Sequence, residues 1–305
     1  MQLFYEGVDI TEKVEVSEAV TTDNAGGVAD CIELTLTNAA DWLRWEPQAD
    51  DKVEIMDAGY KSGIMYIDAL LPEDDVYKLK AFSMPRKARE RRWGSFEGIS
   101  IAELANILAA EIGMSAALYG VDESVRYPYV IRQDETVPGM LQRLLKLEGA
   151  MLKCFDQKLI VVDLLWAQER EPVRTLEMGT DMAGVKHNKT QGKGYSRCVV
   201  KSPYGEGFAI DRNSDASGTL FIDKEPVFNS IQATRYARAS IMNENRGNEQ
   251  LQWSIDFDTS MTGLVRVDIE APGELGGKWL VEQVKHDHIT RKSDCVFLRC
   301  MDGIV

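Results

Sequence analysis

The sequence predicts an α+β fold, mainly β, in which two similar β-domains flank a small unit of helices and a hairpin. The first observation is an internal echo: VEIMDAGYKSGIMYIDALLP, from Val53, aligns without a gap with VDIEAPGELGGKWLVEQVKH, from Val267. Identical residues in this alignment form the pairs Val53/Val267, Ile55/Ile269, Gly59/Gly273 and Gly63/Gly277. The second observation is that each copy occupies a similar place: strand, strand, helix, then three or four strands. Together they indicate the internal duplication of one β-domain.

Periodicity divides the chain into three predicted domains, 1–85, 86–165 and 166–305. In the first, CIELTLTN alternates apolar and polar residues as a half-buried strand does. In the second, two apolar helical stripes each follow an N-cap residue, Ser100 or Thr136, and each ends at a glycine. The third returns to strands. It is interrupted at about 206–249 by an insertion, which we expect to be a mobile surface loop followed by a helix.

The composition excludes some classes of protein. Hydrophobic residues make up 44% and charged residues 28%, which are values typical of a globular chain. The net charge of -14 and the pI near 4.8 disfavour a chain that coats nucleic acid. We expect no membrane span and no signal peptide. The five scattered cysteines, none in a CxxC pair, suit free thiols in a reducing cytoplasm.

The most specific stretch is YVIRQDETVPGMLQRLLKLEGAMLKCFDQKLIVVD, from Tyr129 to Asp163. It combines a Q-x-x-E-T start, a Leu-rich helix, a glycine and a strand pair that ends in an apolar run. With GISIAELANILAAEIGM before it and GELGGKWLVEQVKHDHI near the end, it resembles the baseplate-hub proteins of contractile phage tails. These are the late control protein D family and the related hubs of defective prophages, R-type bacteriocins and type VI secretion.

The resemblance implies that the two β-domains are tail-tube-like β-barrels and that the chain is a structural protein, not an enzyme, without cofactor. It implies a homotrimer at the baseplate, in which six barrels join a hexameric tail tube to a trimeric spike. The implied partners are the spike protein, the tail tube, other baseplate proteins and a tape-measure protein. DNA would pass through the channel without specific binding. Assembly would take place in the cytoplasm of the bacterial host.

The residues themselves offer weak alternatives. No G-x-S-x-G or H-E-x-x-H motif is present, and QGKGYS lacks the spacing of a phosphate-binding loop. Glu73 and Asp75 are more typical of an acidic turn than of a glycosidase pair. The runner-up function is a tail-associated peptidoglycan hydrolase, which a turbidity assay on cell walls would reveal. A carbohydrate-binding module, which would need exposed aromatic platforms, is a third possibility.

The histidines near the C-terminus could suggest a metal site. His286 and His288 share one face of a predicted strand, with Cys295 and Cys300 nearby. The two cysteines have opposite strand parity and would point to opposite faces. We therefore predict no metal site, and expect solvent-facing histidines with buried thiols.

One basic run stands out in this acidic chain. RKARERRWG contains the candidate contact residues Arg86, Lys87, Arg89, Arg91, Arg92 and Trp93. A nucleic-acid patch and a solvated linker are both possible interpretations. We favour a contact with another subunit or baseplate protein, because Arg and Trp are enriched in such interfaces.

Overall fold

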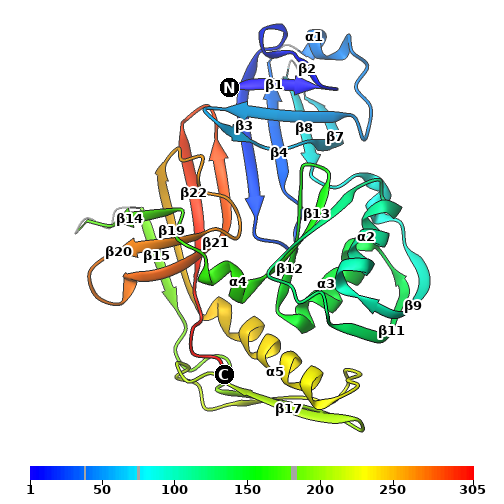
Figure 1. Ribbon diagram of the computed structural model, residues 1–305. Helices are drawn as coiled ribbons and strands as arrows, with labels where there is room; N and C mark the ends of the chain where they lie inside the picture. The colour runs from blue at the N-terminus through cyan, green and yellow to red at the C-terminus, as the bar shows by residue number, and fades with distance from the viewer. Residues whose placement is uncertain (38, 74–75, 180–183) are drawn as a thin grey trace.

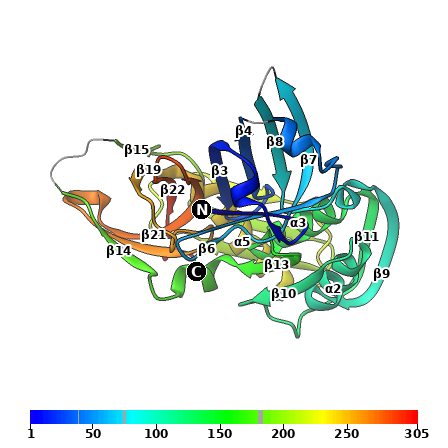
Figure 2. The same ribbon diagram turned by 90° about the horizontal axis from the view of Figure 1, so that it is seen from above.

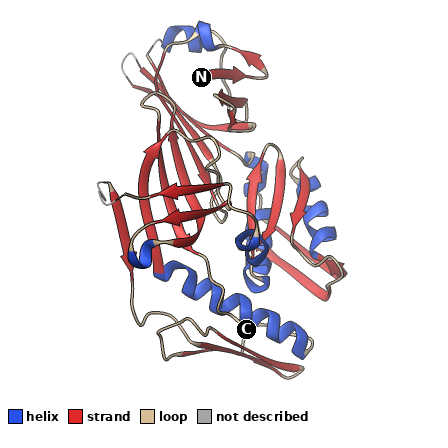
Figure 3. Cartoon of the chain, turned by 60° about the vertical axis from the view of Figure 1, so that its left-hand side comes forward, coloured by secondary structure: helices blue, strands red, loops and turns tan. Residues whose placement is uncertain are grey.

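The computed structural model describes residues 1–37, 39–73, 76–179 and 184–305. The fold is mainly β (Figures 1 and 3), and its largest element is a 14-stranded sheet. The early strands form one end of the molecule, and the helices α2 and α3 lie to one side of the sheet (Figure 1). The long helix α5 lies at the other end, between the sheet and a small three-stranded sheet. The predicted α+β, mainly β fold class is confirmed.

The first half of the large sheet comes from the N-terminal residues. Its strands are β1 (Gln2–Tyr5), β2 (Val8–Asp9), β3 (Val16–Asn24), β4 (Cys31–Leu36), β5 (Lys52–Asp57), β6 (Tyr60–Lys61), β7 (Met65–Glu73) and β8 (Val76–Phe82). A 3-10 turn, η1 (Thr11–Lys13), and a short helix, α1 (Ala39–Leu43), connect them. Alternating residues of β4, Ile32, Leu34 and Leu36, are buried in one core, as the period of CIELTLTN predicted.

The second half of the sheet comes from residues after 170. Its strands are β14 (Arg174–Glu177), β15 (Val185–Lys189), β19 (Glu249–Asp256), β20 (Arg266–Glu270), β21 (Gly277–Asp287) and β22 (Lys292–Arg299). A 3-10 turn, η4 (Gly273–Leu275), joins β20 to β21. This half has its own core around Trp279, Val281 and Phe297. Strands β21 and β3 pair with each other and join the two halves.

The unit between the two halves contains both predicted helices. Its elements are η2 (Arg86–Arg89), β9 (Arg92–Ser100), α2 (Ile101–Glu111), β10 (Ser115–Tyr119), β11 (Arg126–Glu135), α3 (Val137–Glu148), β12 (Ala150–Phe155), β13 (Lys158–Asp163) and α4 (Leu164–Glu169). Ser100 and Thr136 cap α2 and α3 as predicted, and Ser100 forms a capping box with Glu103. Gly149 ends α3 with a φ of 74°, which a glycine adopts without strain.

The insertion is more ordered than predicted. It forms β17 (Gly205–Ile210) and β18 (Thr219–Ile222), which both pair with the preceding strand β16 (Arg197–Ser202), and then α5 (Ser230–Asn245) and η3 (Arg246–Asn248). The expectation of a mobile loop is therefore wrong for the residues of β17 and β18. In β17 the bulky Phe208 is exposed, while Gly207 and Ala209 face α5. A Cβ on Gly207 would lie 2.2 Å from the Thr234 nitrogen, so helix and strand backbones touch, and the usual apolar signal is missing.

The two halves of the large sheet repeat one strand order. The order in the first half is β3-β4-β8-β7-β5-β1, and in the second half it is β15-β19-β22-β21-β20-β14. The outermost strand differs, because β1 pairs antiparallel with β5 while β14 pairs parallel with β20. The echo occupies equivalent strands, β5 and β7 in one copy and β20 and β21 in the other.

Local geometry repeats as well. The β7–β8 ladder has a bulge at Asp68, and the β21–β22 ladder has one at the aligned residue Glu282. The Ile67 carbonyl accepts from Asp50 N–H at 2.8 Å, and the aligned Val281 carbonyl accepts from Leu264 N–H at 2.9 Å. The glycines of the echo all have positive φ: 91° and 67° at Gly59 and Gly63, 67° and 126° at Gly273 and Gly277. Between these glycines the copies differ, with β6 in one and η4 in the other.

Candidate assembly surface

The basic run is not a linker. Arg86, Lys87 and Arg89 form the turn η2, and Arg92 and Trp93 begin β9, which pairs with β11. Arg86 and Arg89 both contact the bulge residue Asp68: Arg89 Nη1 lies 2.8 Å from its carboxylate, and Arg86 Nη2 donates to its carbonyl at 2.7 Å. These two cations lower the pKa of Asp68, with the Arg89 hydrogen bond as the largest cause.

The remaining residues of the run point outward. Arg91 lies 3.4 Å from the carboxylate of Asp134, and Arg92 lies 2.8 Å from that of Glu90. All these arginines are largely exposed, so each pair contributes at most about 1 kcal/mol to stability. Trp93 is 74% exposed, which is unusual for so large an apolar side chain. The structure therefore leaves Arg91, Arg92 and Trp93 accessible for a partner. Arg86 and Arg89 hold η2 to the sheet through Asp68, and the Arg89 side chain, 60% exposed, is accessible as well.

The prediction that the histidines face solvent is wrong. His286 and His288 are both buried, at 0% and 4% exposure, where β21 crosses from its own half of the sheet to β3. His286 contacts Ser293 Oγ at 2.9 Å and the Met261 carbonyl at 3.0 Å. His288 bridges Thr21 Oγ1 at 3.0 Å and Asp57 Oδ2 at 2.9 Å. Each ring thus finds polar partners inside the junction, which makes burial of an imidazole tolerable.

The electrostatics of this junction favour neutral histidines. Burial lowers the pKa of His286 and of His288, in the latter case against the pull of Asp57. Burial also opposes the charge on Asp57, but His288, the terminal amine and Arg291 outweigh it and lower its pKa. Burial raises the pKa of the Cys295 thiol to about 12, as expected for a buried cysteine that takes no part in chemistry. Among the described residues, no group of three or more His, Cys, Asp or Glu side chains is placed to hold a metal ion.

A buried ion cluster ties the middle unit to the sheet, and sequence reasoning missed it. Lys153 on β12 donates to Asp23 Oδ1 at 2.5 Å, to the Asn24 carbonyl at 2.8 Å and to Asp30 Oδ2 at 3.0 Å. Burial raises the pKa of Asp30, whereas the two carboxylates outweigh burial and raise the pKa of Lys153. The signal was present: a lone lysine inside the apolar strand AMLKCF.

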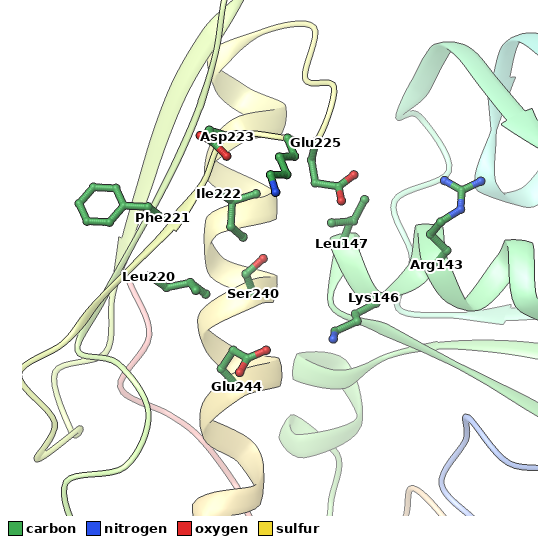
Figure 4. Close-up of a pocket in the computed structure, with 11 residues that line it drawn as sticks. Arg143, Lys146, Leu147, Leu220, Phe221, Ile222, Asp223, Glu225, Ser240 and Glu244 are labelled. Atoms are coloured by element: carbon green, nitrogen blue, oxygen red, sulfur yellow. The ribbon is translucent and has the colours of Figure 1, made fainter.

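Concave surface is present around α5. The cavity in Figure 4, of about 580 Å³, lies between α3, α5 and β18. Its walls mix apolar Leu147 and Ile222 with the charged Arg143, Lys146 and Glu244, while the Phe221 ring points away from it (Figure 4). The described charged groups of both signs surround the opening without converging on one point, so this geometry resembles a crevice between packed elements.

Comparison with known proteins places the fold. No protein-family model matches the sequence, and no curated protein matches it. Among solved structures, the chain has the fold of phage tail proteins, from end to end. A 43 kDa tail protein of prophage MuSo2 from Shewanella oneidensis superposes with a TM-score of 0.78 at 12% identity, covering 99% of both chains.

Two further structures agree with this. A tail protein from Neisseria meningitidis MC58 gives a TM-score of 0.76 at 12% identity, over 98% of this chain and 95% of that one. An E. coli component of the type VI secretion system, described as similar to the T4 bacteriophage tail proteins gp27 and gp5, gives 0.65 at 13% identity. That match covers 99% of this chain and 77% of the other. Among the described residues, no helix is long and apolar enough to cross a membrane.

Proposed function

We propose that this chain is the structural baseplate hub of a contractile injection system, a phage tail or a related particle. In this role it forms a homotrimer that joins the hexameric tail tube to the trimeric spike. It acts without catalysis or cofactor, and it assembles in the cytoplasm of the bacterial host. The boundaries of its two proposed tail-tube-like barrels are 1–85 and 166–305, with 86–165 between them.

The observation that carries the proposal is the strand order written twice in one sheet. A hexameric ring can be matched by three chains only if each chain presents two equivalent surfaces. The repeated order, the bulges at Asp68 and Glu282 and the matched hydrogen bonds supply two such surfaces. The end-to-end similarity of fold to phage tail proteins supports the same function. Closed rings built from repeated head-to-tail contacts are common in protein assemblies.

The charge of the chain is compatible with a hub. A net charge of -14 repels phosphate, so DNA passing through a central channel would not adhere to its wall. The spike, the tube and other baseplate proteins are the expected partners of the outer surfaces.

The test of the proposal is the number of copies in an assembled particle. We expect three copies between the spike and the tube, measured by cryo-electron microscopy or by quantitative mass spectrometry of purified particles. Six copies would instead indicate a tube-like protein, and clearing of cell walls by the pure chain would indicate the hydrolase.

The basic run gives a second prediction. Changing Arg89, Arg91 and Arg92 together to Glu should block particle assembly, because attraction at the contact becomes like-charge repulsion that can cost several kcal/mol. The isolated chain should stay folded, since its surface ion pairs contribute little. Assembly is measured by counting particles in electron micrographs.

A matched control changes three exposed cations elsewhere, Lys201, Arg212 and Lys224, to Glu, with the same change in net charge. Normal particles from the Arg89/Arg91/Arg92 variant would contradict the proposed contact, and would leave the run as a purely local feature.

A further inference from the structure

The strand pairing that joins the two halves of the sheet can serve as a template for a contact between chains. Residues 283–287 of β21 pair antiparallel with 20–24 of β3, and His286 stands opposite Thr21. Two hydrogen bonds flank this ladder, from Ala25 N–H to the Glu282 carbonyl at 2.8 Å and from His288 N–H to the Ala19 carbonyl at 2.9 Å. The second half of the sheet therefore contributes the C-terminal part of β21, and the first half pairs with it through β3.

Each partner of this join has an equivalent in the other half. A row of paired residues crosses four strands of the first half, Ile67–Ala81–Ile32–Thr21, and a matching row crosses the second, Val281–Phe297–Leu251–His187. Thr21 on β3 thus corresponds to His187 on β15. By the spacing of the echo, residues 283–287 of β21 correspond to 69–73 of β7.

Within the part of the chain that the structure describes, these two equivalent edges are free. Among the described residues, Ala69–Glu73 of β7 pair only with β8, and Val185–Lys189 of β15 pair only with β19. The two edges lie on opposite sides of the molecule (Figures 1 and 2), so one chain cannot join them to each other. Open sheet edges invite pairing with another chain.

We propose that β7 of one copy of this chain pairs antiparallel with β15 of the next copy, and that this contact repeats the β21–β3 join between chains. The proposal rests on the proposed hub function, and it names the surface by which the ring closes. Alternation of the internal join with the external one gives every half of the sheet equivalent neighbours on both sides. Such repeated head-to-tail contacts form a ring when the rotation at each join closes the circle.

The equivalence fixes the register. Pro72 stands opposite His187, Leu71 opposite Asn188 and Leu70 opposite Lys189 of the next copy. The Asp68 carbonyl, equivalent to that of Glu282, would accept from the neighbouring chain. In the single chain this oxygen is held by Arg86 Nη2 at 2.7 Å, so the basic run lies beside the docking edge.

Two features distinguish this contact from the internal join. His286 presents its backbone N–H toward β3, whereas the equivalent Pro72 has no N–H to donate. The external ladder therefore lacks one hydrogen bond of the internal one, and a proline on a free edge also discourages uncontrolled pairing. The charges are complementary in sequence, because the register places Glu73 opposite Lys186 of the next copy.

Cysteine crosslinking tests the register. Leu71 and Asn188, both exposed, occupy a pair without direct hydrogen bonds, whose Cα atoms lie about 4.5 Å apart in an antiparallel ladder, within reach of a disulfide. The full-length variant L71C/N188C is oxidised with diamide over a range of concentrations, and its products are sized by non-reducing electrophoresis and native mass spectrometry. We expect a covalently closed trimer. The control is L71C/K189C, in which the second cysteine points to the other face of β15.

The outcomes separate this proposal from the hub function. A closed trimer formed by L71C/N188C but not by L71C/K189C supports both. The strand pairing is overturned if the protein forms a non-covalent trimer but L71C/N188C forms no disulfide between chains. It is also overturned if the control L71C/K189C is linked to the same extent. Both results leave the trimeric hub standing. Linked dimers and longer open chains without a closed trimer support the pairing and overturn the three-fold hub. No linked species at any concentration overturns the pairing.

Discussion

Replacing Lys153 by Ala is expected to lower the free energy of unfolding by about 3–5 kcal/mol, because it leaves two buried carboxylates without their cation. Asp23 and Asp30 are 4% and 2% exposed, so water cannot replace the ammonium group. Asp23 also accepts from Gly263 N–H at 2.6 Å, and Asp30 accepts from Asn24 N–H at 2.7 Å. The loss would therefore spread from the middle unit into the end of β3, beside the join with β21.

The measurement is urea unfolding followed by circular dichroism. The control is the triple variant Lys153→Met, Asp23→Asn, Asp30→Asn, which keeps the shape and removes all three charges. It should be more stable than Lys153→Ala, since replacing a whole buried ion cluster costs far less than breaking it. A stability of Lys153→Ala within about 1 kcal/mol of the wild type would mean that the carboxylates take up protons or water at little cost.

Much of this architecture was predictable because the local rules and the tertiary structure agree. The helices α2 and α3 carry their own N-caps and terminal glycines, so their bounds follow from Ser100, Thr136 and Gly149. The echo predicted two equivalent hairpins without any knowledge of their surroundings. Even the bulge falls on an aligned pair of acidic residues, Asp68 and Glu282.

The misses arose where tertiary contacts decide the environment of a residue. The HDH sequence gives no sign that β21 leaves its own half of the sheet and buries both histidines against β3. In β17 the inward positions are Gly207 and Ala209, because α5 packs on the backbone itself, so the strand lacks the usual pattern. The free edges of β7 and β15 depend on which strands pair, and single-sequence periodicity cannot specify that.

Replacing Trp279 by Ala is expected to lower the free energy of unfolding by about 3–5 kcal/mol, the range typical of a large aromatic removed from a core. Trp279 is fully buried in the core of the second half, and its Nε1 donates to the Leu275 carbonyl at 3.0 Å. The Arg299 guanidinium lies over its ring at 4.3 Å from the centroid. One substitution thus removes packing, a hydrogen bond and a cation–π contact.

The same substitution should also destabilise β15, the strand whose free edge we propose to pair with the next copy. The ring of His187 on β15 lies edge-on to Trp279, at 6.4 Å between centroids, so the tryptophan packs against a side chain of this strand. Amide hydrogen exchange in Trp279→Ala should therefore speed up in β15 and β19 more than in β4 and β8 of the other half. Trp279→Phe, which keeps an aromatic ring, is the control and should lose less stability. An equal increase of exchange rates in both halves would mean that they unfold as one unit. It would contradict the presence of a separate core in each half of the sheet.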